Sequence, residues 1–415
     1  MIPILVYALA FVSLISLLAW LFIFWHPARP WDFQPVGDDV EIEALASGKI
    51  YPRVAVIVPA RNEAGSLPRT LPALLKQDYP GGFEVFLVND RSSDGTANLA
   101  REIAVRENLA QRLTVLENDS LPQAWMGKVW ALNSGARRAA ETGAEFFLLT
   151  DADILHAPGS LRRLVSESMD AKFGLNSRMA RLRCESPAEK LLIPAFVFFF
   201  NLLYPMRRAN DPKDALASAA GGCVLLSREA WTALGGSFEP IKAEIIDDVN
   251  LARCVKGRGL PIRLSLSRSE VESIREYPHL FDVWKMVRRT AFTELNYSWL
   301  RLLGALAGLA LLFVVPFVAL SAGALLLALT FNSALLPFAL GLAFKGGAAL
   351  AVMGHVYAPA MRFFKLPALF AFSLPIAAVL YGLMTLDSGL RHVRGAGTQW
   401  RETTEGVKGN GMTNE

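Results

Sequence analysis

Two aspartates separated by one residue, Asp151 and Asp153, have the spacing that points most directly to chemistry in this chain. Two carboxylates placed in this way can share one Mg²⁺ or Mn²⁺, which proteins commonly hold by one or two carboxylates together with substrate phosphates. The chain has no P-loop and no G-x-G-x-x-G fingerprint, which disfavours kinase, ATPase and dehydrogenase chemistry. The pair therefore predicts a metal-held diphosphate that acts as a leaving group.

Two more polar segments follow apolar runs, the PARNE segment at 59–63 and the NDRSSDGT segment at 89–96. Capping of helix N-termini explains such residues equally well when each segment is taken alone, because Asp, Asn and Ser are preferred there. Three acidic segments at the ends of strands of one sheet are harder to explain by capping. We therefore expect them to form one site.

Four apolar runs predict buried strands, and helical patterns separate them. The predicted strands cover 54–59, 85–89, 113–116 and 146–150, and the predicted helices cover 66–77, 93–108, 128–141 and 158–170. Strands that alternate with helices predict an α/β domain, over residues 51–300, with a mostly parallel sheet covered on both faces. Ligands bind at the carboxyl ends of the strands in such sheets, where the Asp-x-Asp pair lies.

The first apolar stretch, residues 2–25, contains no charged side chain and is long enough to span a bilayer as a helix. A cleaved signal peptide is the alternative, but no basic residue precedes Ile4 and bulky aromatic residues end the run. We expect an uncleaved transmembrane anchor over 1–26. Arg29 and Arg53 follow it, so the positive-inside rule places the next domain in the cytoplasm.

A second apolar region covers 302–386 and predicts about three transmembrane helices, near 302–329, 335–359 and 366–386. A division of 302–344 into two short helices is the alternative, since it would move Lys345 from the middle of a helix to an end. Three spans would also leave the arginines after 386 outside, against the charge rule. The polar, glycine-rich segment 395–415 predicts a disordered tail.

A third apolar run, 191–206 (LLIPAFVFFFNLLYPM), is short for a span and contains Pro194. It is either a buried core helix or a segment in the membrane interface beside the active site.

Composition agrees with a chain that lies partly in lipid, since 53% of residues are hydrophobic and the mean hydropathy is +0.32. The net charge of +4 and the absence of a basic-aromatic pattern argue against nucleic-acid binding. Three widely spaced cysteines predict small core residues in a reduced compartment.

The order of six motifs, PARNE, VNDRSSDGT, GKVWALNSG, TDAD, AGGCVLLSREA and IIDDVNLA, resembles the family 2 glycosyltransferases with a GT-A fold. The resemblance covers about residues 52–300. The terminal apolar segments and the RCESPAEKLLIPAFVFFF stretch are similar to those of the bacterial hopene-associated glycosyltransferases. Membership implies an enzyme that takes a sugar from a nucleotide-sugar donor with Mg²⁺ or Mn²⁺.

The resemblance also implies roles on the donor side. Asp90 would recognise the nucleotide base, and the PARNE motif would contribute Pro59, Arg61 and Glu63 beside that pocket. Lys128 would touch the donor. The same motifs imply that Asp151 and Asp153 hold the metal and the diphosphate. Asn89 stands where many relatives have another aspartate, so a paired carboxylate is not implied there.

On the acceptor side, the resemblance implies that Gly221 and Gly222 form a wall that a substrate can approach closely. Asp247 and Asp248 match an acidic pair before a helix, with Asp248 as the base. An inverting transfer needs one carboxylate to take the proton of the acceptor hydroxyl, and a neighbouring carboxylate raises the pKa of such a base. A helix N-terminal cap is the alternative for this pair, and both roles are compatible.

Arg289 lies at the arginine position of a Gln-x-x-Arg-Trp motif of processive relatives, but Met286 and Thr290 replace the glutamine and tryptophan. Arg289 could neutralise the departing diphosphate, or Arg288-Arg289 could contact lipid headgroups. His156 is either a third metal ligand or a loop histidine.

We therefore expect a multi-pass protein of the bacterial inner membrane whose cytoplasmic catalytic domain transfers one sugar to a lipid acceptor, such as a hopanoid or another polyprenoid. The alternatives are a polyprenyl-phosphate sugar transferase, a small processive polysaccharide synthase and a non-catalytic membrane scaffold. The altered arginine motif disfavours polymer synthesis. The three retained carboxylates Asp151, Asp153 and Asp248 disfavour the scaffold.

Overall fold

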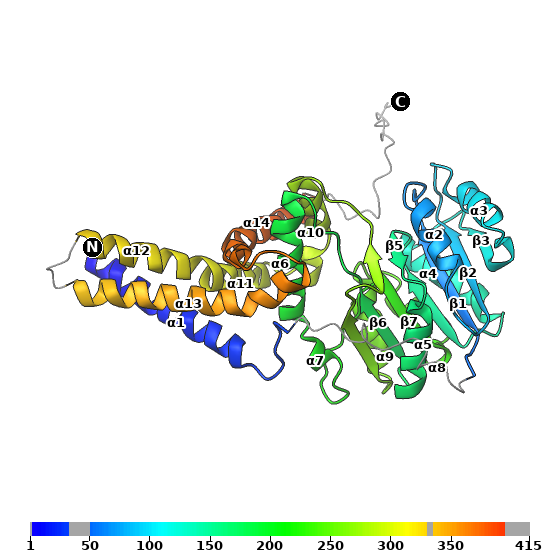
Figure 1. Cartoon of the computed structure of the whole chain (residues 1–415), viewed down its shortest axis with the longest axis horizontal. Coiled ribbons are helices and arrows are strands. Elements are labelled where there is room, and N and C mark those ends of the chain that lie inside the picture. Colours follow the sequence, from blue (N-terminus) through cyan, green and yellow to red (C-terminus); the bar gives the residue numbers. More distant parts are fainter. Residues whose placement is uncertain (1, 33–49, 330–334, 395–415) are drawn as a thin grey trace, which may run out of the picture.

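The computed structural model describes residues 2–32, 50–329 and 335–394. An α/β domain lies at one end and a bundle of long helices at the other (Figure 1). The predicted disordered tail, 395–415, lies outside the described residues.

A seven-stranded sheet forms the centre of the α/β domain, in the order β3-β2-β1-β4-β7-β6-β8. Its strands are β1(Val54–Ala60), β2(Phe83–Asn89), β3(Leu113–Glu117), β4(Phe146–Thr150), β6(Leu175–Met179), β7(Cys223–Ser227) and β8(Ile262–Leu266). The pairs are parallel except for those of β7, which is antiparallel to β4 and β6. The prediction of a mostly parallel α/β sheet is confirmed, and the four predicted strands are β1 to β4.

Helices cover both faces of the sheet, as continuous apolar strands require. On one face are α2(Leu67–Leu75), α3(Thr96–Arg106) and α5(Ser160–Ala171), and on the other are α4(Gly127–Ala140), α8(Arg228–Ala233) and α9(Asp247–Lys256). Strand β1 shows the alternation directly. Val56 belongs to the apolar cluster with α2, α3 and α5, whereas Ile57 belongs to the cluster with α4, α8 and α9.

A small second sheet pairs β5(Ile154–His156) antiparallel with β9(Val271–Ser273). Strand β5 begins directly after the Asp-x-Asp pair, and Ile274 N–H donates a hydrogen bond of 3.0 Å to the carbonyl of Asp153. This pairing brings the segment after β9 against the end of β4. Short elements complete the domain: η1(Ala110–Arg112), α7(Met206–Ala209) and η2(Glu239–Ile241).

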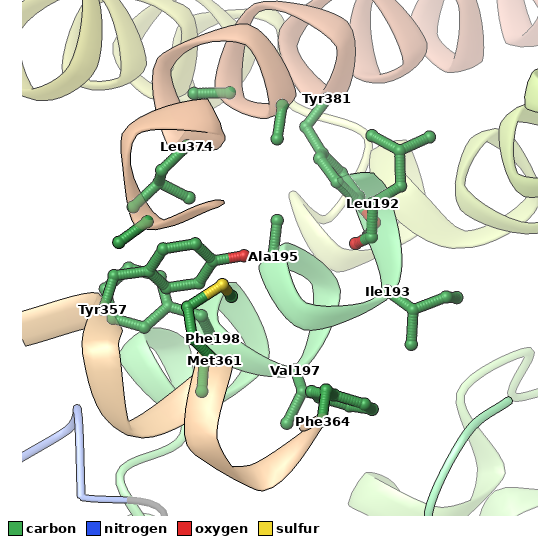
Figure 2. Packing of buried hydrophobic residues seen from close by; sticks show 14 of the residues in the cluster. Leu192, Ile193, Ala195, Val197, Phe198, Tyr357, Met361, Phe364, Leu374 and Tyr381 are labelled. Carbon is green, nitrogen blue, oxygen red and sulfur yellow. Dashed lines mark hydrogen bonds between the residues drawn. The ribbon is translucent and has the colours of Figure 1, made fainter. Parts of the chain in front are cut away.

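The third apolar run of the sequence lies within α6(Pro187–Leu203), which starts at a capping box formed by Ser186 and Glu189. Figure 2 shows side chains of α6 packed against the C-terminal helices. The ring of Phe198 contacts that of Tyr357 at a centroid distance of 5.1 Å, and the Tyr381 hydroxyl donates to the Leu192 carbonyl at 2.9 Å. The prediction of a buried core helix therefore holds for the face of α6 that contacts the C-terminal helices. Through these contacts α6 joins the α/β domain to the bundle.

The helices that connect and form the bundle are α1(Ile2–Trp25), α10(Leu280–Glu294), α11(Trp299–Leu309), a π-helical segment η3(Ala310–Val314), α12(Val315–Leu329), α13(Leu336–Phe363), η4(Ala368–Ser373) and α14(Leu374–Val393). Four segments among the described residues are long and apolar enough to span a membrane: 4–25, 299–329, 336–363 and 368–393. The helix around Lys345 is therefore continuous. Its ammonium group donates a hydrogen bond of 2.8 Å to the Ala10 carbonyl of α1, so this charge has a polar partner inside the bundle.

Helix α14 lies at the end of the bundle next to the α/β domain, beside α10 (Figure 1). It runs antiparallel to α11, because Gly389 lies against Leu302 and Gly382 against Leu306. Its last turns bind α10, where Asp387 accepts a hydrogen bond of 2.8 Å from the Trp284 indole. The far end of the bundle, where the N-terminus lies, is formed by α1, α12 and α13 (Figure 1).

Candidate active site

One cavity lies at the carboxyl ends of the central strands and collects most of the predicted site residues. It is lined by Pro59, Glu63, Met126, Lys128, Val129, Asp151, Ala152, Asp153, Glu244, Ile245, Asp247, Arg275 and Arg289. The PARNE segment after β1, the Asp-x-Asp turn after β4 and the start of α9 therefore meet, as the strand-end argument predicts.

Lys128 lies between the two acidic pairs. Its ammonium nitrogen is 2.9 Å from Asp151 Oδ1 and 3.5 Å from Asp247 Oδ2. The lysine is in the first turn of α4, whose first residue Gly127 follows the loop after β3. Although burial of the amine opposes its charge, the carboxylates of Asp151, Asp247 and Asp248 raise its pKa. Lys128 is therefore a permanent cation between Asp151 and Asp247.

Asp153 pairs with a different cation, Arg275. Its Oδ2 lies 2.7 Å from Nε of Arg275, whose guanidinium also lies 3.7 Å from Glu63. Burial is the main cause of a raised pKa for Asp153, and Arg275 opposes this shift. The two carboxylates of the Asp-x-Asp pair thus each have a cationic partner.

The cavity suits a divalent cation bound together with a phosphorylated ligand. Five carboxylates and only three cationic side chains line it. Over residues 2–32, 50–329 and 335–394, no group of three or more histidine, cysteine or carboxylate side chains is arranged to hold a metal alone. Asp151 and Asp153 would therefore supply two ligands, and phosphate oxygens and water would complete the shell, as is usual for Mg²⁺.

Asp248 lies next to this cavity and lines a second, smaller one with Gly221, while Asp247 borders both. The amide of Gly221 donates to Asp248 Oδ2 at 2.6 Å, and that of Val249 donates to Oδ1 at 2.8 Å. A Cβ atom on Gly221 would lie 3.2 Å from both Asp248 Oδ2 and Lys128 Nζ. Glycine at 221 therefore allows the base candidate and the lysine to approach the same point.

The environment of Asp248 suits a general base. Burial, followed by the like charge of Asp247, raises its pKa to about 6, although Lys128 and the two amide hydrogen bonds oppose this shift. A carboxylate with a pKa just below neutrality is largely ionised at pH 7 and accepts a proton more readily than an ordinary aspartate. The N-cap residue of α9 is Ile246 and no side chain caps this helix, so the capping alternative for Asp247 and Asp248 is wrong, and both aspartates lie in its first turn.

Asp90 is fully buried and does not line the cavity. Arg91 donates to both of its carboxylate oxygens, at 3.0 and 2.9 Å, and Arg61 lies 3.7 Å away. A nucleobase could reach Asp90 only if Arg91 turned away. Neighbouring Asn89 donates to Glu117 at 2.6 Å, so it has a structural partner of its own.

Two further residues lie apart from the cavity. Gly222 packs against Ile154 and Ala180, beneath the Asp-x-Asp turn.

His156 is in strand β5, so the loop interpretation is wrong. Its two ring nitrogens contact the hydroxyls of Thr150 and Ser160, and burial lowers its pKa to about 4. It is a neutral core histidine and does not reach the cavity that holds Asp151.

Arg289 lines the cavity from α10. The neighbouring Arg288 packs on the ring of Phe281 and lies 3.7 Å from Asp387 of α14, so it contributes to helix packing.

Arg275 and Glu244 are lining residues that sequence reasoning missed. Neither lies in a motif, although the basic residue three positions before Pro278 could have drawn attention to the segment after β9.

This fold and this arrangement of carboxylates and cations define a GT-A-type transferase domain. The profile described as "Glycosyltransferase like family 2" matches residues 52–293, more than half of the chain. The chain therefore belongs to the family 2 glycosyltransferases.

Similar proteins agree with this assignment. An N-acetylglucosaminyltransferase from Mesorhizobium japonicum is 29% identical over 200 residues, covering 46% of this chain and 43% of the relative. A 4,4'-diaponeurosporenoate glycosyltransferase from Staphylococcus aureus is 26% identical over 215 residues, covering 50% and 52%. An undecaprenyl-phosphate mannosyltransferase from Micrococcus luteus is 32% identical over 126 residues, covering 30% and 48%. The chain thus spans about half, or less, of the length of these curated relatives.

The fold is shared with the mannosyltransferase PcManGT from Pyrobaculum calidifontis, solved in complex with GDP-Man and Mn²⁺. The two structures give a TM-score of 0.53 at 22% identity, covering 91% of this chain and 99% of that protein. At this identity the comparison establishes the GT-A-like fold.

Proposed function

We propose that this enzyme transfers a sugar, with inversion, from a nucleotide-diphosphate donor to the hydroxyl group of a membrane lipid. The observation that carries the proposal is the placement of the Asp-x-Asp pair and of the Asp247–Asp248 pair on two sides of Lys128. Asp151 and Asp153 would hold Mg²⁺ or Mn²⁺, which when bound stabilises the departing diphosphate. Asp248 would take the proton of the attacking hydroxyl.

The packing of the domain onto the bundle supports a lipid acceptor. One apolar cluster extends from Tyr357 and Tyr381 of the bundle through α6 to Ala220, which directly precedes Gly221. This packing fixes the turn that carries Gly221, and with it the Asp248 carboxylate, next to the helices that could span the membrane. The hopanoid or polyprenoid class remains the proposal suggested by the sequence resemblance.

The charges on the acceptor side favour an alcohol over a lipid phosphate. Glu244, Asp247 and Asp248 surround this side, and the nearest cation, Lys128, already contacts two aspartates. Like charges would repel a phosphate or carboxylate acceptor. An alcohol acceptor also explains the presence of a base, because an alcohol must lose its proton as it attacks, whereas a phosphate dianion can attack without a base. The polyprenyl-phosphate transferase therefore remains the second candidate.

The test of the proposal is nucleotide release from a panel of UDP- and GDP-sugars with Mn²⁺, measured with and without bacterial lipid extract. We expect one donor to release nucleotide, faster with the extract than without it. A labelled product that resists mild acid would indicate a glycosidic bond to an alcohol. An acid-labile, phosphate-linked product would support the second candidate. Absence of nucleotide release and of lipid labelling would contradict both and favour a scaffold.

The activity should depend on pH through Asp248. A base works only when it is deprotonated, so kcat/KM should fall as pH drops through about 6 and reach a plateau above about 7. Asp247→Asn removes the like charge that raises the pKa of Asp248, so the acid limb should move to lower pH. A pH profile with an unchanged acid limb in this variant would contradict the coupling of the two carboxylates.

We also propose an orientation in which α1, α11–α12 and α13 cross the membrane and α14 re-enters it from the catalytic side. This arrangement places Arg391 and Arg394 on the same side as Arg29, Arg362 and the α/β domain, and so removes the conflict with the charge rule that three full C-terminal spans would create. The connection between α12 and α13, at 330–335, contains no lysine or arginine. The catalytic domain is therefore proposed to face the cytoplasm, at the inner membrane in a bacterium.

Reporter fusions test this orientation. Green fluorescent protein fused after residue 415 should fluoresce, and alkaline phosphatase at the same place should be inactive. Alkaline phosphatase inserted at 332 should be active. Active phosphatase at the C-terminus would show that α14 crosses the membrane completely.

A further inference from the structure

Arg275 lies in the cavity although no motif of the sequence marks it. It lines the cavity together with Lys128 and Arg289, and it forms the short contact with Asp153 and the longer one with Glu63 described above. Its side chain is 36% exposed. The guanidinium therefore faces the open cavity as well as the two carboxylates.

The backbone fixes the place from which this side chain emerges. Strand β9 pairs with β5, and the hydrogen bond from Ile274 N–H to the Asp153 carbonyl closes the ladder directly before Arg275. The Cα atom of Arg275 is thus held beside the Asp-x-Asp turn. The long side chain can still exchange one anionic partner for another by rotation about its own bonds.

A divalent cation and Arg275 would compete for the same carboxylate. Arg275 contacts Oδ2 of Asp153, and a cation on this carboxylate would repel the guanidinium and weaken that contact. The guanidinium would then lie in the cavity close to where a metal-bound diphosphate must be. Arginine pairs well with phosphate oxygens because its planar fork donates two parallel hydrogen bonds.

We propose that Arg275 is a donor-binding residue that pairs with Asp153 until a divalent cation binds there, and then contacts the diphosphate of the nucleotide. The inference rests on the proposed function, since it requires a nucleotide donor and a cation at Asp153. It predicts opposite effects on two binding equilibria when Arg275 is replaced. A purely structural role would not produce opposite signs.

The test is calorimetric binding to the full-length protein in detergent, comparing the wild type with Arg275→Gln. The probes are Mn²⁺ alone, and UDP and GDP in saturating Mn²⁺. Mn²⁺ alone should bind the variant about 2–5-fold more tightly, as expected for the loss of a partly exposed ion pair. Whichever nucleotide binds the wild type should bind the variant about 10-fold more weakly or worse.

Two controls accompany this comparison. Arg181→Gln removes an arginine that pairs with Glu272 at 3.5 Å beside the same small sheet but does not line the cavity, so neither affinity should change. Arg275→Lys keeps the charge and should recover part of the nucleotide affinity.

If Arg275→Gln binds Mn²⁺ as tightly as the wild type or more weakly, Arg275 and the cation do not compete for Asp153. The same conclusion would follow if the wild type did not bind Mn²⁺ at all. Unchanged nucleotide binding would overturn the contact with the diphosphate. If the wild type binds neither UDP nor GDP, the proposed function fails instead, and the Mn²⁺ comparison still decides whether Arg275 competes at Asp153.

Discussion

Asp248→Asn should lower kcat by about 10²–10⁴-fold, the usual contribution of a positioned general base. Asparagine has nearly the same shape, and its carbonyl oxygen can still accept one of the two amide hydrogen bonds from Gly221 and Val249. The variant should therefore fold normally and bind the donor with an almost unchanged KM. Single-turnover transfer to lipid, followed at saturating donor, measures the chemical step directly.

Asp247→Asn is the matched control, because it changes the adjacent carboxylate in the same turn of α9. It leaves the base candidate in place, and Lys128 keeps its 2.9 Å contact with Asp151. We expect it to lose far less activity than Asp248→Asn at pH 8, where the base is ionised in either case. If Asp247→Asn abolished transfer and Asp248→Asn did not, the base would be Asp247, which borders the larger cavity.

Removal of divalent cations should have the second large effect. EDTA treatment is expected to lower kcat/KM at least about 100-fold, because a bound cation contributes several kcal/mol to the stabilisation of a departing diphosphate. Mn²⁺ or Mg²⁺ should restore the wild type. Asp153→Asn should need much more cation for the same recovery, since it removes one of two carboxylate ligands.

Asp119→Asn serves as the control for this series, because Asp119 is exposed on the loop after β3 and does not line the cavity. Its cation requirement should equal that of the wild type. Full activity of the wild type after exhaustive EDTA treatment would contradict the assignment of Asp151 and Asp153 to a metal. The cationic residues Lys128, Arg275 and Arg289 would then have to neutralise the diphosphate without a metal ion.

Much of the sheet could be predicted because strands β1 and β4 are almost entirely apolar. Strand β6 was missed for the opposite reason. Its central residues Asn176, Ser177 and Arg178 are polar yet fully buried, and Arg178 is satisfied by Glu167 at 2.5 Å and Glu270 at 3.0 Å. These partners come from distant parts of the chain, so no local hydropathy pattern reveals the strand.

Strand order predicted that Asp151, Asp153 and Glu63 would meet in one cavity, but it did not predict that Arg275 would line the same cavity. Asp151, Asp153 and Glu63 lie at strand ends, where a parallel sheet brings polar residues together. Arg275 reaches the same place only because β9 pairs with β5, a contact between segments far apart in the sequence. The pairing of Asp90 with Arg91 was equally hidden, because the motif gives the residues and not their rotamers.

The membrane region shows a similar limit. Hydropathy correctly predicts long apolar helices at both ends of the chain. It does not distinguish a helix that crosses from one that returns, because both are apolar and of similar length. The proposed return of α14 is argued from its antiparallel contacts with α11 and from the hydrogen bond between Trp284 and Asp387.

The most direct test of the central claim is mass spectrometry of membrane lipids from cells of the source organism that express the wild type, Asp248→Asn or no copy of this protein. We predict one hexose- or N-acetylhexosamine-bearing neutral lipid that is present with the wild type and missing from both other strains. Identical glycolipid profiles in the three strains would contradict lipid glycosylation by this enzyme, whatever the purified protein does to nucleotide sugars.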